Sequence, residues 1–188
     1  MIGERYEQRT RLAVLKVRVG TGFRVSLLRG EPLGHIVHWL GKGSFLCPGV
    51  RCPACLASTG ARWVGLMPCR LHGADGSRRT VLVEFSGDAW ARLAGLLRFE
   101  GVDCGVGVEV ELSRKSMRGG LIAEGVLCGE AEKVRPLADW VLVDALATLY
   151  GLPRCLEGWG PEEWTERVRE VVVGKLERAL QACGSEFA

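Results

Sequence analysis

Long apolar runs are absent from this sequence of 188 residues, and histidine, tyrosine and methionine are scarce, with 3, 2 and 3 residues respectively. No stretch of about 18 uncharged apolar residues occurs, which excludes a membrane-spanning helix. The first eleven residues, MIGERYEQRTR, lack the apolar core of a secretory signal, so we expect a cytoplasmic protein. With 47% hydrophobic and 25% charged residues, the composition excludes wholesale disorder.

The common catalytic motifs are also missing. No His-Glu-x-x-His, Gly-x-Ser-x-Gly or phosphate-binding P-loop pattern occurs. A zinc-dependent nucleobase deaminase needs His-x-Glu and Pro-Cys-x-x-Cys, but no histidine here is followed two positions later by glutamate, and Arg51 precedes Cys52. We therefore expect a protein that is not an enzyme.

Cysteine, in contrast, is frequent, with 8 residues, and three of them are clustered in the segment CPGVRCPAC. Disulfides are rare in a reducing compartment, where clustered cysteines more often hold a metal ion. A Cys-x2-Cys turn brings two thiolates to one ion, and a third thiolate five residues earlier can reach the same ion. The remaining cysteines stand apart in the sequence, and we expect at least those at 104, 128, 155 and 183 to be small buried apolar residues.

A structural zinc site needs four ligands, and the sequence offers two sets. We favour the first set: His38, Cys47, Cys52 and Cys55. The alternative leaves Cys47 unused and combines the Cys-x2-Cys pair with Cys69 and His72. His35 is three residues from His38, so in a strand the two rings point to opposite faces. Both sets are closed, so we expect a structural Zn2+ without an open position for water.

The first two thirds of the chain have the patterns of β-strands. Alternating or β-branched segments occupy residues 11–19, 23–28, 35–40, 61–71, 80–85, 106–112 and 121–127. A helical pattern covers 86–98, with Ser86 or Asp88 as its cap. The order β-β-β-α-β-β is that of an OB-like five-stranded barrel, here with more strand candidates than the fold needs. The segment Gly41–Gly60, which holds the cysteines, has no periodicity.

The end of the chain is helical, so the fold class that we expect is mainly β with C-terminal α. Apolar residues recur at helical spacing from Pro136 to Tyr150 and again from Pro161 to about Cys183. Residues 1–133 contain 19 basic and 13 acidic residues, whereas residues 134–188 contain 6 basic and 9 acidic ones. We expect residues 1–133 to form an OB-like domain with a zinc subdomain inserted in it, and residues 134–188 a helical extension.

One histidine, then one cysteine and then a Cys-x2-Cys pair lie between early strands of such a barrel. In this arrangement the chain resembles the zinc-containing single-stranded DNA-binding proteins of T4-like phages. The resemblance depends on the four favoured zinc ligands and on the strand order of residues 11–128. The spacings here are shorter, and the strongly acidic C-terminal tail of that family is missing. The resemblance implies binding of single strands, DNA before RNA, with little sequence specificity, in the replication, recombination or repair of a phage or mobile element.

Cations and aromatic rings occur where an OB-like domain would use them to bind phosphates and stack bases. The candidate nucleic-acid-binding residues are Arg29, Trp39, Lys42, Arg62, Trp63, Arg114, Lys115 and Arg118. The alternative hypothesis is a zinc-ribbon adaptor that recruits a larger nucleic-acid-processing machine through its C-terminal helices, residues 137–183. No membrane partner is expected, and the oligomeric state is left open.

Overall fold

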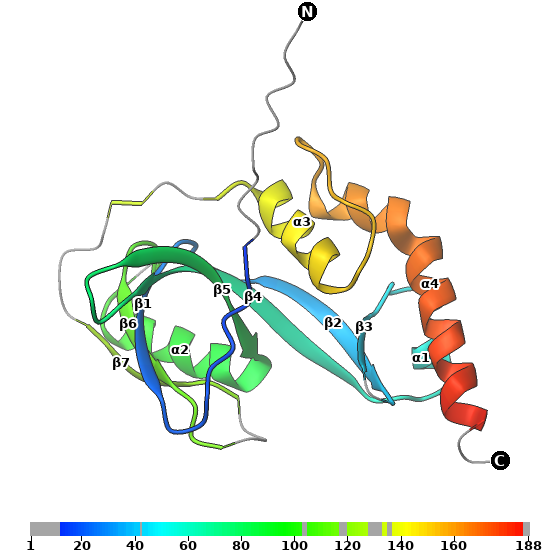
Figure 1. Ribbon diagram of the computed structural model, residues 1–188, viewed down its shortest axis with the longest axis horizontal. Coiled ribbons are helices and arrows are strands. Elements are labelled where there is room, and N and C mark those ends of the chain that lie inside the picture. The colour runs from blue at the N-terminus through cyan, green and yellow to red at the C-terminus, as the bar shows by residue number, and fades with distance from the viewer. Residues whose placement is uncertain are drawn as a thin grey trace, which may run out of the picture.

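In the computed structural model the described residues are 12–41, 43–102, 105–116, 120–127, 133–134 and 137–185. They contain seven strands and four helices (Figure 1). The strands are β1 (Gly22–Leu27), β2 (Leu33–Leu40), β3 (Gly43–Leu46), β4 (Ala61–His72), β5 (Arg78–Ser86), β6 (Glu109–Ser113) and β7 (Ile122–Val126). The helices are α1 (Pro53–Leu56), α2 (Gly87–Phe99), α3 (Asp139–Leu149) and α4 (Pro161–Ser185). The expected class, mainly β with C-terminal helices, is confirmed.

All seven strands belong to one antiparallel sheet, in the order β3-β2-β4-β1-β6-β7, with β5 paired to β4. The long strand β4 organises it: its first half pairs with β2, its second half pairs with β1, and β5 runs along its other edge. Among the described residues the sheet is open, and it has two strands more than the five expected. The additional strands β2 and β3 form a hairpin that follows β1 and precedes β4 in the sequence (Figure 1).

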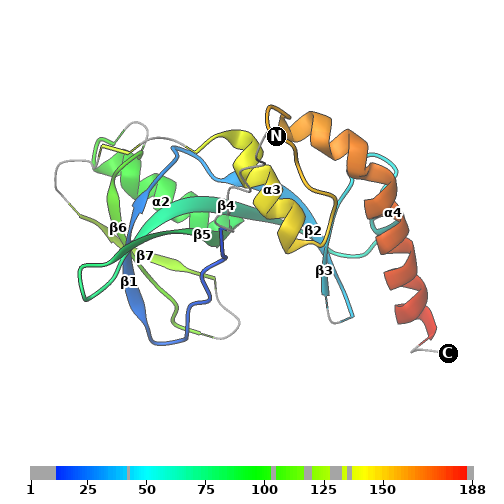
Figure 2. The ribbon, with the colours of Figure 1, turned by 45° about the horizontal axis from the view of Figure 1, so that its top comes forward.

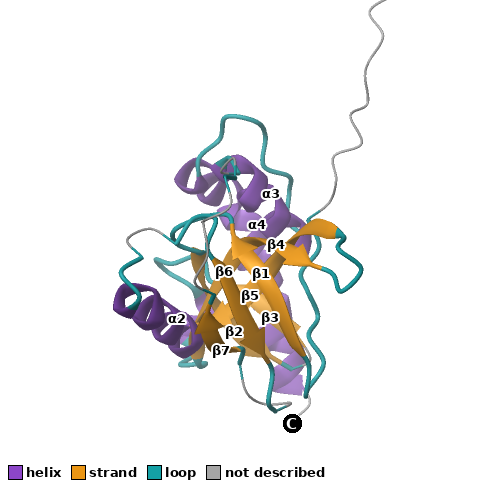
Figure 3. Cartoon of the chain, turned by 90° about the vertical axis from the view of Figure 1, so that its left-hand side faces the viewer, coloured by secondary structure: helices purple, strands orange, loops and turns teal. Residues whose placement is uncertain are grey.

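Two hydrophobic cores lie on opposite faces of β4 and β5, because successive side chains of a strand alternate between faces. Met67 belongs to one core with α2, which we call the α2 core. The neighbouring Leu66 belongs to the other, which contains α3, α4, the β2–β3 hairpin and α1, and which we call the helical core. Figures 2 and 3 show α2 apart from the α3–α4 pair. The C-terminal helices therefore form a common core with the cysteine-bearing segment.

Most predicted elements are confirmed within a few residues, including the cap of α2, where the Ala89 amide donates to Ser86 Oγ at 3.3 Å. The strand predicted over 11–19 is wrong: within residues 12–19 only Val14 forms an isolated parallel bridge, to Leu82 of β5. That segment lies beside β5 only at this bridge and then turns at Gly20, whose φ is +80°. In the segment without periodicity, β3 and α1 were missed because four residues are too few to show a period.

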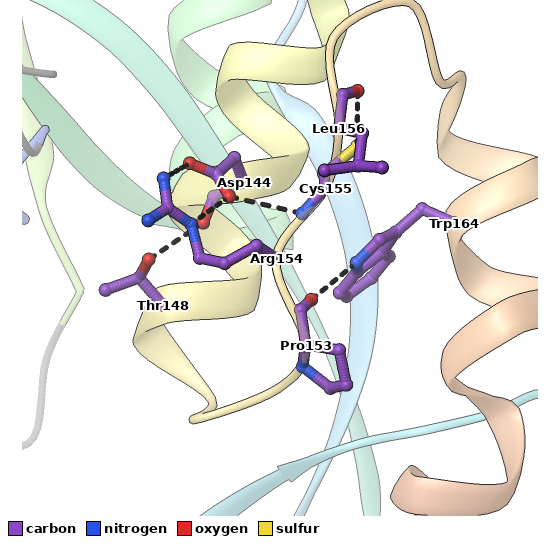
Figure 4. A network of polar contacts seen from close by, with 7 residues as sticks. All are labelled: Asp144, Thr148, Pro153, Arg154, Cys155, Leu156 and Trp164. Carbon is purple, nitrogen blue, oxygen red and sulfur yellow. Dashed lines mark hydrogen bonds and ion pairs between the residues drawn. The ribbon is translucent and has the colours of Figure 1, made fainter. Parts of the chain in front are cut away.

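A polar network connects α3 to the segment that leads into α4 (Figure 4). Asp144, only 9% exposed, accepts hydrogen bonds from the Arg154 guanidinium and, at 3.2 Å, from the Cys155 amide. The indole Nε1 of Trp164 donates to Pro153 O at 2.9 Å. These bonds satisfy buried polar groups that would otherwise destabilise the fold. The network therefore connects α3, the segment after it and the start of α4.

Candidate metal centre

Four side chains from three consecutive elements converge near the β2–β3 hairpin. They are His38, Cys47, Cys52 and Cys55, and one ligand atom from each lies within 4.8 Å of every other. These are the four residues of the favoured set. They could hold a metal ion, and they are the one such group among the described residues.

The local backbone explains why the four side chains meet. His38 lies in β2, and the Cys47 amide donates to Ile36 O at 2.8 Å, so Cys47 extends the β2–β3 ladder by one position. The chain then reverses in a tight turn that includes Arg51, at a φ of +60°. Cys52 takes the N-cap position of α1, and Cys55 follows within that helix. A hairpin and one helical turn thus provide all four ligands.

Three of the distances between the four ligand atoms fit a tetrahedral zinc ion, and all are within 4.8 Å. With Zn–S near 2.3 Å and Zn–N near 2.0–2.1 Å, a tetrahedral angle places two sulfurs about 3.8 Å apart and a sulfur and a nitrogen about 3.6 Å apart. The Sγ atoms of Cys47 and Cys55 are 3.8 Å apart, and His38 Nε2 is 3.4 Å from the Sγ atoms of both Cys52 and Cys55. Three thiolates and one imidazole are a common donor set for structural zinc.

The electrostatics of Cys47 and Cys55 favour a cation beside their thiols. The pKa of Cys47 is raised to about 12, mainly by burial; a hydrogen bond with the Gly49 backbone lowers it, and the adjacent Cys52 and Cys55 thiols contribute to the rise. Burial is also the first cause of the raised pKa of Cys55. Neighbouring thiolates repel one another, so the Cys47 and Cys55 thiols stay protonated unless a positive charge stabilises their anions. A bound divalent cation supplies that charge and deprotonates its thiol ligands.

The alternative ligand pair lies elsewhere in the structure. Cys69 is fully buried in the α2 core, and His72 Nε2 lies 2.8 Å from Ser26 Oγ. Both belong to the half of β4 that pairs with β1, whereas Ala61 at the other end of β4 pairs with His38. The structure therefore does not bring Cys69 and His72 to the cluster.

His35 is on the other face of β2 from His38, as the strand spacing predicts. Its Nε2 lies 3.0 Å from the Tyr150 hydroxyl, and burial lowers the pKa of His35 to about 4. The unfolded chain, with a pKa near 6.5, binds more protons between these pH values. We therefore expect the free energy of unfolding to fall as the pH is lowered from about 6.5 to about 4.

Urea unfolding of zinc-saturated protein at pH 7 and pH 5 tests this expectation, with His35→Gln for comparison. Glutamine keeps a hydrogen-bonding group but does not titrate, so the variant should lose less stability on acidification. The metal ligands take up protons equally in both proteins, so the difference between them reports on His35. Equal losses would show that His35 does not govern the acid sensitivity.

The predicted stacking residues lie on opposite faces of the sheet. Trp39, 59% exposed, is on the same face of β2 as Val37, whose partner across the ladder is Arg62. Arg62 is also exposed, and as a diagonal neighbour it is within reach of Trp39. Trp63 points to the other face. Among the candidate residues that the structure describes, Trp39 and Arg62 therefore provide an exposed ring and an exposed cation on one surface.

The Trp63 ring packs against two glycines of neighbouring strands. A Cβ added at Gly34 would lie 2.7 Å from its indole Nε1, and one added at Gly65 would lie 2.4 Å from its ring carbon. These two glycines are partners across the β2–β4 ladder. The indole therefore lies on backbone that carries no side chains, which explains why the ring is only partly exposed.

The other predicted cations that the structure describes have protein partners. Arg29 forms an ion pair with Asp139 at the start of α3, and Lys115 forms one with Glu124 at 3.1 Å. The Arg114 guanidinium donates to Val17 O at 3.3 Å. Lys42 and Arg118 lie outside the described residues.

Two of the isolated cysteines are described. Cys155 is fully buried, as expected, and Cys183 is partly buried beside the helical core, while residues 104 and 128 lie outside the described residues.

One residue beside the cluster was not indicated by any pattern in the sequence. Thr59, just after α1, places its Oγ1 3.3 Å from His38 Nδ1.

Comparison with known proteins finds no matching family model, no similar curated protein and no similar solved structure. In the part of the chain that the structure describes, no helix is long and apolar enough to cross a membrane. The functional assignment therefore depends on the geometry of the chain itself.

Proposed function

We propose that His38, Cys47, Cys52 and Cys55 bind a structural Zn2+, and that this ion supports a β-domain that binds single-stranded nucleic acid with little sequence specificity. The observation that carries the zinc site is the match between the four ligand positions and tetrahedral geometry. All four positions around the ion are filled by protein. The ion therefore contributes to folding rather than to hydrolysis.

Strand pairing supports an OB-like reading of the sheet. Five strands, β1, β4, β5, β6 and β7, with α2 after the third of them, follow the order β-β-β-α-β-β, and β1 pairs with both β4 and β6. In this reading the β2–β3 hairpin and α1 are the inserted zinc subdomain, located between the first two strands. Loops of an OB-fold at this position contact oligonucleotides.

The surface that we assign to nucleic acid is the Trp39–Arg62 pair beside the zinc subdomain. An exposed ring provides a stacking surface for an unpaired base, and a neighbouring guanidinium attracts the phosphate backbone. DNA is preferred to RNA in this proposal because of the resemblance to phage single-strand-binding proteins.

Titration of labelled oligo(dT) over a range of salt concentrations tests this proposal. We expect Trp39→Ala to lower affinity about 5- to 150-fold, because one stacked base contributes about 1–3 kcal/mol. Arg62→Ala should also reduce the dependence of log K on log salt by about 0.7, which corresponds to one lost phosphate contact on a single strand.

The matched control is an exposed ring and cation at the end of α2, Phe99, 85% exposed, and Arg98. Replacing either by alanine should leave both the affinity and the salt slope unchanged. Failure of the wild-type protein to bind oligo(dT) at low salt would refute the proposal. Equal effects at the two sites would refute the assigned surface.

The adaptor hypothesis is less favoured because the aromatic residues of the C-terminal helices have partners within the chain. Trp164 is 1% exposed, Trp159 lies under the Arg167 guanidinium at 4.3 Å, and the Tyr150 hydroxyl bonds His35. These contacts within the chain leave few rings for a partner protein.

A further inference from the structure

Thr59 makes two side-chain contacts that together define how His38 presents its ring. Its Oγ1 is 2.7 Å from Ala54 O and 3.3 Å from His38 Nδ1. On the other side of the ring, Nε2 faces the thiols of Cys52 and Cys55. His38 is fully buried, so its nitrogens depend on these protein partners.

The direction of the hydrogen bonds follows from the chemistry of the groups. A carbonyl oxygen only accepts, so the Thr59 hydroxyl proton is donated to Ala54 O. The hydroxyl oxygen is then left to accept from His38, which requires a proton on Nδ1. In the neutral imidazole this places the lone pair on Nε2, the atom that points toward the three thiols.

The turn that ends α1 brings Thr59 to these contacts. Ser58 has a φ of +54°, in the left-handed region that side chains other than glycine disfavour. The bend turns the chain back after α1, where the Thr59 amide also donates to Ala54 O, at 3.0 Å. The Ser58 amide donates to Cys55 O at 3.0 Å, so the two backbone bonds form a Schellman motif that ends α1 and returns Thr59 to His38.

We propose that Thr59 is a positioning residue for the metal centre: it holds His38 in the Nδ1–H tautomer, so that Nε2 is ready to bind the ion. This inference rests on the proposed zinc site and adds a residue outside the four ligands. Groups that bond the second nitrogen of a metal-binding histidine fix its tautomer and orientation. Their loss commonly weakens metal binding by about 10- to 100-fold.

Competition between the full-length zinc-loaded protein and a zinc chelator measures the effect. Thr59→Val keeps the size and branching of the side chain but removes the hydroxyl, and we expect it to lower zinc affinity about 10- to 100-fold. Thr59→Ser keeps the hydroxyl and should remain within about 3-fold of wild type. Rescue by serine separates the hydrogen bond from packing, because serine lacks the methyl group.

Long-range 1H–15N correlation spectra of zinc-loaded wild-type protein provide a second measurement that needs no variant. We expect His38 to show a proton on Nδ1 and the metal on Nε2. A proton on Nε2, ligation through Nδ1, or a Thr59→Val affinity equal to wild type would overturn the proposal. Purified protein without stoichiometric zinc would instead refute the metal site itself, so the two failures are distinguishable.

Discussion

Cys52→Ser is expected to remove the metal and to lower the melting temperature by about 10 °C or more. Cys52 is both a proposed ligand and, at 1% exposure, a member of the helical core. Apparent binding free energies of structural zinc reach about 10–16 kcal/mol in small zinc domains, and this binding contributes directly to folding. Zinc per chain, determined by atomic emission, and thermal unfolding followed by circular dichroism measure the two effects.

The matched control is Cys69→Ala, which replaces a fully buried cysteine in the α2 core, away from the cluster. This variant should lose some stability through the small cavity but retain one zinc ion per chain. A Cys52→Ser protein that keeps its zinc and its melting temperature would show that the ligand assignment is wrong. Loss of zinc from Cys69→Ala would favour the alternative set.

Trp164→Ala should produce the second large effect, a loss of about 3–5 kcal/mol in the free energy of unfolding. Trp164 is the largest fully buried side chain, and its indole bonds Pro153 O at 2.9 Å. Trp164→Phe keeps most of the apolar contact but leaves that carbonyl without its donor, so a loss of about 1–3 kcal/mol is expected. Urea unfolding of the zinc-saturated proteins measures both losses.

Trp39→Ala serves as the control for this series, since the same residue type is exposed there. An exposed substitution of this kind should change stability by less than about 0.5 kcal/mol. If Trp164→Ala cost no more than Trp39→Ala, α4 would not be part of the core, and the structural assignment of the C-terminal helices would be wrong.

The sequence predicts well which four side chains come together, because they are close in the chain. Three cysteines within nine residues and one histidine on the preceding strand need only a hairpin and a helical turn to meet. Spacing alone does not choose between His38 and the pair Cys69 and His72. The register of β2 on β4 places Ala61, and not the far end of β4, beside His38, so the structure does not bring Cys69 and His72 to the cluster.

The predicted nucleic-acid surface is harder to derive because it depends on contacts between distant segments. Arg29 is paired with Asp139, which lies 110 residues later in the chain. Trp39 and Trp63 point to opposite faces only once the strands are in register. Helical spacing predicted the C-terminal helices, but it does not indicate that they share a core with Leu66 and Leu82 of the sheet.

The helical core has a consequence for how the chain acquires its structure during synthesis on the ribosome. All four ligands have been translated once residue 55 is complete, yet α1 packs on α4, which begins at Pro161. Early intermediates therefore carry the ligands without the helix that covers them. Burial of Cys52 and Ala54 must wait until more than a hundred further residues have emerged.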